Sequence, residues 1–238
     1  MPFRRREIQM QVDDIALARI DSGVLLDIGS NIGEYIEKLL NKEGCQVIGF
    51  EPSLAPYKES INKFPKANIQ FVALSNYVGS ATLKIPVIGG NNDYGCGSIV
   101  KDFPEPTLIG GESLSVIEQV VPVNKLDSYE LNNLKFIKID VEGAEQEALE
   151  GGWETIKREL PDIYIELEEV HRHDCFKTVS GMLKELGYRG YFNYSDKILS
   201  TDEFNQETMQ KCTFDNVGAH DRIGEYVWNF LFTTKELT

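Results

Sequence analysis

VLLDIGSNIG, residues 24–33, joins an apolar run to a glycine-containing turn. An apolar run without alternation is typical of a strand that is buried on both faces of a parallel sheet. The apolar residues after the turn recur at helical spacing, as Ile32, Ile36, Leu39 and Leu40. Parallel sheets bind ligands where such turns leave the carboxyl ends of their strands. The segment therefore predicts an α/β fold with a binding site at its first strand–helix turn.

Further apolar runs alternate with helix-period segments along the chain. Strands are predicted at residues 45–50, 69–74, 136–139 and 163–167. Helices are predicted at residues 144–149, 153–156 and 176–186, the last closed by Gly187. This alternation indicates a sheet with helices packed on both of its faces.

The carboxyl-terminal part of the chain follows a different pattern. Residues 188–194 and 226–233 predict two strands that pair antiparallel at one sheet edge. The predicted fold class is α/β, with one domain over residues 1–238 and a doubly wound, mostly parallel sheet of about seven strands. Segments 86–121 and 195–225 fit no regular pattern, and we expect irregular insertions there. Such insertions are either lids and binding loops or plain surface segments.

Composition excludes several classes of partner. The formal net charge of −14 repels a phosphate backbone, so nucleic acid is not expected to bind. We expect no membrane span and no signal peptide, because no apolar stretch is long enough. The short basic run at residues 4–6 is expected to be a solvated chain end. Four cysteines without a C-x-x-C pair predict a reducing, cytoplasmic setting and no zinc site.

The first turn departs from the fingerprint of dinucleotide-binding folds. A G-x-G-x-x-G motif that began at Gly29 would place glycines where Asn31 and Glu34 stand. Asparagine tolerates left-handed backbone conformations, so the sharp turn can survive. The carboxylate of Asp27 disfavours a phosphate and favours an ammonium group, such as that of S-adenosylmethionine. The alternative is a turn with a structural role only.

Glu51 closes the second strand in VIGFEP, 18 residues after Gly33. An acidic side chain at this place can accept hydrogen bonds from the two hydroxyls of a ribose. Proteins that bind NAD use the same device, so Glu51 indicates an adenosine without naming the cofactor. Leu74 and Ser75 end the third strand at the same edge and would border the adenine. The alternative for Glu51 is a solvated strand end.

FIKIDVEGAE places Asp140 at the carboxyl end of the fourth strand, and Glu142 follows two residues later. Glu166 ends the fifth strand, so the three carboxylates are expected to converge beside the first turn. Their mutual repulsion would raise the pKa of at least one of them, as a general base requires. The alternative is that Asp140 and Glu142 cap the following helix. Lys138, on the same strand face, is expected to pair with Asp140.

This cluster suits the transfer of a methyl group to a hydroxyl. Such a transfer is an in-line displacement that depends on alignment, and the hydroxyl needs a base for its proton. A carboxylate or His171 would serve as that base. The same groups suit Mg²⁺ or Mn²⁺ better than zinc. The sequence leaves the need for a metal open.

DIGSNIGEY, FEPS, VALSN and VPVNKLDSY, together with FIKIDVEGAEQEALEGG and PDIYIELE, resemble the FkbM-type methyltransferase family over about residues 24–170. The D-V-E-G-A-E segment is the most specific part. The resemblance implies a class I methyltransferase fold, S-adenosylmethionine as donor, and O-methylation of glycan sugars or of secondary metabolites such as macrolides. Many relatives have a histidine close behind the strand-five glutamate, whereas four residues separate Glu166 from His171 here.

Carried over by position, the resemblance implies a donor loop of Asp27, Gly29, Asn31 and Gly33, with Glu51 on the donor's ribose. It also implies that Asp140 and Glu142 lie where the donor meets the acceptor. The reading of the residues adds further members to both sets. The expected donor site is Asp27, Gly29, Ser30, Asn31, Gly33, Glu51, Pro52, Leu74 and Ser75. The expected catalytic set is Asp140, Glu142, Glu166 and His171. The acceptor would enter over these carboxylates and under the loop of residues 89–100. Tyr94, Tyr191 and Trp228 are candidates to stack on a sugar ring.

The sequence therefore predicts an O-methyltransferase that acts on a sugar hydroxyl. A non-sugar acceptor is the alternative within the same enzyme class. An NAD-dependent oxidoreductase is disfavoured by the broken glycine motif and by the lack of a Tyr-x-x-x-Lys pair after the fourth strand. A non-catalytic scaffold is disfavoured because it requires neither the turn, nor Glu51, nor the acidic cluster.

Overall fold

The computed structural model describes residues 11–103, 108–109, 112–214, 220–222 and 224–237, so the basic run at residues 4–6 lies outside the described residues. Its main sheet has eight strands. They are β1 (Gly23–Ile28), β2 (Cys45–Phe50), β3 (Asn68–Gln70), β9 (Leu134–Ile139), β10 (Asp162–Glu166), β11 (Arg189–Tyr194), β12 (Lys197–Ser200) and β15 (Asn229–Thr233).

The strand order in this sheet is β12-β11-β15-β10-β9-β1-β2-β3. Strands β3, β2, β1, β9 and β10 run parallel, and β15 pairs antiparallel with both β10 and β11. The antiparallel pairing of the last two predicted strands is therefore confirmed. The count of seven strands and their place at the edge were wrong. Strand β15 inserts between β10 and β11, and β12 adds an eighth strand that occupies the edge.

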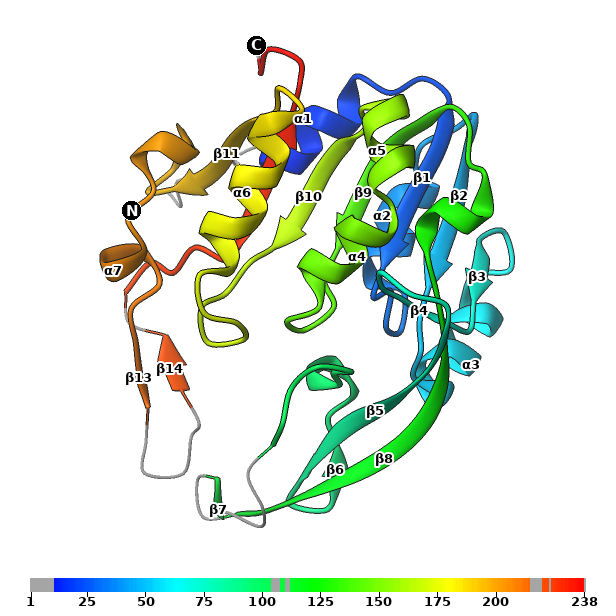
Figure 1. The fold of residues 1–238 in the computed structure, drawn as a ribbon, viewed down its shortest axis with the longest axis vertical. Coiled ribbons are helices and arrows are strands. Elements are labelled where there is room, and N and C mark those ends of the chain that lie inside the picture. The colour runs from blue at the N-terminus through cyan, green and yellow to red at the C-terminus, as the bar shows by residue number, and fades with distance from the viewer. Residues whose placement is uncertain (1–10, 104–107, 110–111, 215–219, 223, 238) are drawn as a thin grey trace, which may run out of the picture.

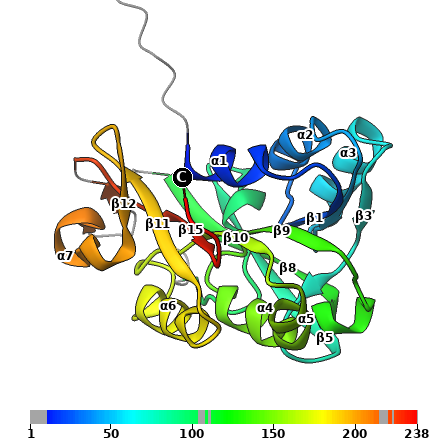
Figure 2. The same ribbon diagram turned by 90° about the horizontal axis from the view of Figure 1, so that it is seen from above.

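Helices cover both faces of the main sheet (Figure 2). Those described are α1 (Val12–Ala18), α2 (Glu34–Leu40), α3 (Leu54–Lys63), α4 (Glu145–Gly151), α5 (Trp153–Glu159), α6 (Cys175–Glu185) and α7 (Gln206–Met209). Helices α1 to α3 lie on one face and α4 to α6 on the other. Alternate residues of β1 serve the two cores: Leu25 packs with Ile36 of α2, and Leu26 packs with Leu149 of α4. This two-sided burial explains the continuous apolar run of β1.

The predicted third strand is split between two sheets. Strand β3 pairs with β2 in the main sheet, whereas β4 (Ala73–Leu74) pairs with β8 (Glu112–Asn124) in a second sheet. The chain leaves the main sheet after Gln70, and a single apolar run therefore covers two short strands. Leu74, at the end of β4, still lines the cavity described below.

The second sheet forms an arm, defined here as the described residues between 79 and 124, that extends away from the main sheet (Figure 1). Its long strands β5 (Gly79–Ile88) and β8 pair antiparallel from Gly79 opposite Val123 to Ile88 opposite Leu114. Its shorter described elements are β6 (Asn91–Asn92), the 3-10 helix η1 (Tyr94–Cys96) and β7 (Leu108–Ile109). Much of the segment predicted as irregular at residues 86–121 is thus regular sheet.

Sequence patterning misses this arm because most of β8 has no single apolar face. Ile117 and Val120 lie on opposite faces of the strand and are 44% and 74% exposed. In the part of β8 whose side chains are described, only Val121 and Val123 are buried, and they pack with Leu83 and Ile85 of β5. The hydrophobic alternation that marks a half-buried strand is therefore short.

The second insertion, residues 195–225, also contains regular elements. Strands β11 and β12 form a hairpin over Ser195 and Asp196, both of which have positive φ angles, 46° and 59°. A two-residue turn of this kind favours Asn-Gly, so Ser-Asp gives no hairpin signal in the sequence. The later elements are the 3-10 helix η3 (Thr201–Glu203), α7, β13 (Cys212–Phe214) and β14 (His220–Arg222). Among the described residues, no helix combines the length and apolar character that a membrane crossing requires.

Candidate active site

The turn between β1 and α2 is held against the two neighbouring strands. The amides of Gly29 and Ser30 both donate to the carbonyl oxygen of Phe50, at 2.9 and 3.1 Å. Gly29 has a φ of +83°, and a Cβ added there would lie 1.7 Å from the carbonyl oxygen of Asp140. Asn31 has a φ of 46°, the left-handed conformation expected for the residue that replaces a motif glycine. The turn therefore brings the ends of β1, β2 and β9 into contact.

Glu51 fastens this turn to the chain after β2. Its Oε2 accepts a hydrogen bond from the amide of Asn31 at 2.7 Å, and its Oε1 accepts one from the amide of Ser53 at 2.6 Å. The side chain is buried, with 5% exposure. Burial raises its pKa, whereas the two amides lower it. Each carboxylate oxygen retains a second lone pair, so Glu51 can still accept hydrogen bonds from a ligand.

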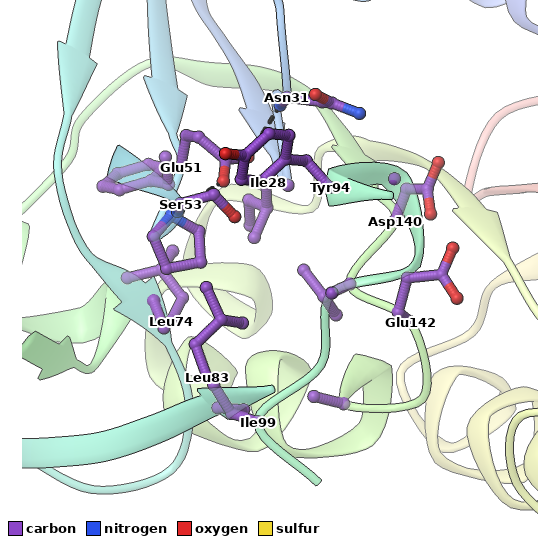
Figure 3. A pocket seen from close by; sticks show the side chains of 18 residues that line it. Ile28, Asn31, Glu51, Ser53, Leu74, Leu83, Tyr94, Ile99, Asp140 and Glu142 are labelled. Carbon is purple, nitrogen blue, oxygen red and sulfur yellow. Dashed lines mark hydrogen bonds between the residues drawn. The ribbon is translucent and has the colours of Figure 1, made fainter. Parts of the chain in front are cut away.

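A first cavity, here called the apolar cavity, opens between the turn, the end of β9 and the arm (Figure 3). Glu51 and Ser53 lie on one side of it, and Asp140 and Glu142 on the other. Its wall is mostly aliphatic and aromatic. The apolar lining residues are Ile28, Phe50, Pro52, Ala73, Leu74, Leu83, Ile99, Val141 and Ala144. Such a wall, with Glu51 on the side away from Asp140 and Glu142, suits an adenosine, with the base on the apolar part and the ribose on Glu51.

A second cavity, here called the polar cavity, lies on the α2 side of the same turn. It is lined by Asp27, Ser30, Ile32, Glu34, Tyr35, Lys38 and Lys138, and it shares Gly29, Asn31 and Asp140 with the apolar cavity. Carboxylate, ammonium and hydroxyl groups therefore face this space. Such a lining suits a zwitterionic group rather than an aromatic one.

Asp27 is the buried acid of the polar cavity. Its side chain is 2% exposed, and its Oδ2 has no hydrogen-bond partner among the described residues. Burial raises the pKa of Asp27 to about 7, Lys138 lowers it, and Asp140 and Glu51 raise it further. Asp27 and Lys138 are direct neighbours on β1 and β9. A buried oxygen without a partner is costly, and a cationic donor group would satisfy it.

The expected catalytic residues do converge. Asp140 lines both cavities, and its Oδ2 lies 3.1 Å from Nζ of Lys138, so the expected pairing of these residues is confirmed. Glu142 lies 3.4 Å from Nε2 of His171. One side-chain donor atom from each of Glu142, Glu166 and His171 falls within a group in which all separations are at most 4.8 Å. These residues therefore lie together, as expected, although four residues separate Glu166 from His171 along the chain.

The pKa of two of these carboxyl groups is raised, but mutual repulsion is the smaller cause. Burial raises the pKa of Glu142 to about 7, against the lowering effect of Lys101. Burial raises the pKa of Glu166 to about 9, with a further contribution from Asp140. Lys138 is fully buried; burial opposes its charge, yet Asp140, Glu166 and Asp27 together raise its pKa.

The arm contributes two residues that were not expected from the sequence, Ser98 and Lys101. Nζ of Lys101 lies 2.6 Å from Oε2 of Glu142, and Oγ of Ser98 donates to the carbonyl oxygen of Glu142 at 2.8 Å. Tyr94, with Gly95 and Gly97, lines the apolar cavity. The loop expected to cover the site does reach it, but no spacing in the sequence links Ser98 or Lys101 to Glu142.

Some expected residues do not line the site. Ser75 is buried and absent from both linings, and its carbonyl oxygen packs where Gly151 leaves room. Gly33 also lies outside both linings, because its role is packing: a Cβ there would lie 2.5 Å from the ring of Phe64. Tyr191 and Trp228 do not line either cavity, which leaves Tyr94 as the aromatic candidate.

Comparison with known proteins decides the family. The model of the methyltransferase FkbM domain matches residues 27–191, which include the turn, Glu51 and the cluster of Asp140, Glu142, Glu166 and His171. The chain belongs to the FkbM methyltransferase family. This membership confirms the resemblance carried by the sequence motifs.

A solved structure of another FkbM methyltransferase shows the same fold. Methyltransferase FkbM from Methylobacillus flagellatus KT is similar to this FkbM-family chain, with a TM-score of 0.54 and 14% identity over 89% of this chain and 44% of that one. The chain thus spans less than half the length of that protein. A precorrin-6y C5,15-methyltransferase from Geobacter metallireducens GS-15 has a TM-score of 0.44 and 12% identity, over 97% of this chain and 92% of that one. No curated relative matches the sequence significantly.

Proposed function

We propose that the chain is an S-adenosylmethionine-dependent O-methyltransferase that acts on a hydroxyl of a sugar in a glycan or glycoconjugate. The observation that carries the proposal is the meeting of the apolar and polar cavities at Asp140. One cavity suits an adenosine and the other a zwitterion, which are the two ends of this donor. The bound donor would supply an electrophilic methyl group on a sulfonium.

Three features of the chain support binding of this donor. The Oδ2 atom of Asp27, buried and without a hydrogen-bond partner among the described residues, fits the donor's ammonium group. Glu51 has lone pairs for the ribose hydroxyls, and Leu74 belongs to an apolar wall that fits the adenine. The carbonyl oxygen of Asp140 lies so close to Gly29 that position 29 has no room for a side chain. Asn31 and Glu34 stand where a dinucleotide-binding motif has its further glycines, which disfavours a dinucleotide.

Asp140 is the residue that we assign to the acceptor. Its side chain is 36% exposed and faces both cavities, so an incoming hydroxyl can reach it. It would orient the hydroxyl and receive its proton as the oxygen attacks in line. Lys138 holds the carboxylate in place. The neighbouring carboxylates favour an acceptor with several hydroxyls, which supports a sugar.

The test is a screen of acceptors with a donor whose methyl group is labelled. Nucleotide sugars and glycans are compared with macrolides and with amine acceptors of similar size. We expect the label in a sugar, in a bond that resists mild alkali, as an ether does. Label found only on an amine, or only on a non-sugar hydroxyl, would contradict the proposed acceptor.

Glu51→Ala should weaken binding of S-adenosylmethionine by about 1–3 kcal/mol, because hydrogen bonds to a charged group are lost. The loss corresponds to roughly a 5-fold to 150-fold rise in Kd, measured by calorimetric titration. The substitution also removes the partner of the Asn31 and Ser53 amides, so thermal stability is measured in parallel. An unchanged Kd would remove Glu51 from the site.

Asp27 should make donor binding depend on pH. Its pKa is raised from 3.8 to about 7, so the apo protein holds an extra proton between these values and loses stability as the pH rises through them. The ammonium requires the ionised carboxylate, so donor affinity should rise from pH 5 to pH 8. Asp27→Asn should bind the donor weakly at every pH, yet gain about 1–2 kcal/mol of stability above pH 7. Equal pH dependence in both proteins would contradict this role.

The three cysteines whose side chains are described, Cys45, Cys96 and Cys175, are free thiols. Their state supports the expectation that the protein works in a reducing compartment. Cytoplasmic location is part of the proposal on the same ground.

A further inference from the structure

We propose that Glu142, Glu166 and His171 form a binding site for one divalent cation of the Mn²⁺ or Mg²⁺ type. The catalytic part of this inference rests on the proposed function, because the cation would serve the acceptor hydroxyl. Binding of the cation itself does not depend on methyl transfer.

The geometry of the three donor atoms carries the proposal. All lie within 4.8 Å of one another, and Oε2 of Glu142 is 3.4 Å from Nε2 of His171. Around a Mg²⁺ ion, with bonds of roughly 2.1 Å, opposed ligands are roughly 4.2 Å apart. Small side-chain rotations would therefore bring the three atoms to bonding distance, and water or acceptor oxygens would complete the coordination.

The three ligands come from segments that pack tightly together. Glu142 lies in the turn after β9 with a φ of 55°, Glu166 ends β10, and His171 follows in the next loop. A Cβ at Gly143, which adjoins Glu142, would lie 3.3 Å from the carbonyl oxygen of His171. The side chains of Glu142 and His171 are each 14% exposed, so they are shielded yet not sealed from solvent.

The ligand types indicate a hard cation. Two carboxylates with one imidazole suit Mn²⁺ or Mg²⁺, whereas zinc sites are built mainly from cysteine and histidine. Nζ of Lys101 lies 2.6 Å from Oε2 of Glu142, so a bound ion would share this carboxylate with Lys101 or displace the lysine. Lys101 and Lys138 face four carboxyl groups, those of Asp27, Asp140, Glu142 and Glu166. A divalent ion would require Glu142 and Glu166 in their ionised forms, so its binding would release protons from these groups.

A cation here would explain why the cluster adjoins Asp140. Glu142 and Asp140 both line the apolar cavity, so an ion on Glu142 lies beside the group assigned to the acceptor. A metal-bound hydroxyl loses its proton more readily, and two neighbouring sugar hydroxyls can occupy two adjacent positions on one ion. The ion would position the acceptor, and Asp140 would receive the proton.

The experiment is a titration of the full chain with MnCl₂, in which free Mn²⁺ is followed by its electron paramagnetic resonance signal. We expect one ion per chain, displaced by excess Mg²⁺. Glu166→Gln and His171→Asn should each raise the Kd for Mn²⁺ by at least about tenfold. Loss of a residue that only orients a metal ligand already costs about 10–100-fold in affinity. His173→Asn is the matched control, because His173 is 89% exposed and lies outside the cluster.

Two further measurements are needed. One shows whether the variants are folded, and the other shows whether methyl transfer depends on the metal site. Calorimetric titration with S-adenosylmethionine checks that Glu166→Gln and His171→Asn are folded and retain the donor site. A wild-type protein that does not bind Mn²⁺, or that binds it equally well after both substitutions, would overturn the metal site. If the metal site is overturned in this way, methyl transfer that continues in the presence of a chelator would still support the proposed function. Binding of Mn²⁺ without any methyl transfer would support the metal site and count against the function.

Discussion

Replacing Asp140 with asparagine should lower the turnover of methyl transfer by about 10²–10⁴-fold, the range for removing a general base. Asparagine has the same shape but cannot accept the proton of the hydroxyl. The Kd for S-adenosylmethionine should rise by less than about tenfold, or 1.4 kcal/mol, because the other donor contacts remain. Turnover is measured with a labelled methyl donor, and Kd by calorimetric titration.

Asp102→Asn is the matched control for this substitution. Asp102 lies on the arm, its side chain is 91% exposed, and it pairs with Lys84 away from both cavities. Turnover of this variant should equal that of the wild type. An Asp140→Asn protein with wild-type turnover would assign proton transfer to another group, and one that no longer binds the donor would place Asp140 in the donor site alone.

Replacing Gly29 with alanine should destabilise the protein by more than about 4 kcal/mol, which is exceptional for a single substitution. The added Cβ would lie 1.7 Å from the carbonyl oxygen of Asp140 and 2.8 Å from its carbonyl carbon. Both atoms belong to the backbone, so no side chain can rotate to relieve the clash. The ends of β1 and β9 would have to separate, which opens the core and the site together.

Gly187→Ala separates this clash from the cost of a left-handed backbone. Gly187 has a φ of +84°, nearly the same as Gly29, but nothing lies within 4 Å of an added Cβ. Its replacement should cost about 1–2 kcal/mol, from backbone strain alone. Urea unfolding of both variants measures the difference. Equal losses in the two proteins would show that the close approach of Gly29 to Asp140 is not tight.

The parallel half of the main sheet could be predicted because its strands are buried on both faces. Strand β2 has the predicted bounds, Cys45–Phe50, and β9 and β10 differ from prediction by one or two residues at their ends. Continuous apolar runs of this kind arise only where helices cover both faces. The position of β15 could not be predicted, since strand order depends on long-range pairing that leaves no local pattern.

The arm was beyond prediction for a related reason. Pairing of β5 with β8 joins residues up to 44 positions apart, such as Gly79 and Val123. Exposed valine and isoleucine on both faces of β8 hide its period. Lys101 and Ser98 reach Glu142 only because this arm folds back onto the turn after β9.

The candidate site was predictable where a backbone constraint leaves a mark in the sequence. Glycine at position 29, asparagine at 31 and the acid at 51 each follow from the turn and from what it holds. The electrostatics were less predictable. Repulsion among carboxylates was expected to raise a pKa, but burial is the largest cause at both Glu142 and Glu166. The burial of a side chain depends on the whole fold and cannot be predicted from the spacing of residues in the sequence.

Calorimetric titration of the wild-type chain with S-adenosylmethionine and, separately, with NAD tests the central claim most directly. The claim is that the joined cavities at Asp27, Glu51 and Asp140 hold a cationic, phosphate-free adenosyl compound. We predict saturable binding of one S-adenosylmethionine per chain and no measurable binding of NAD. Failure to bind S-adenosylmethionine, or tighter binding of NAD, would contradict it.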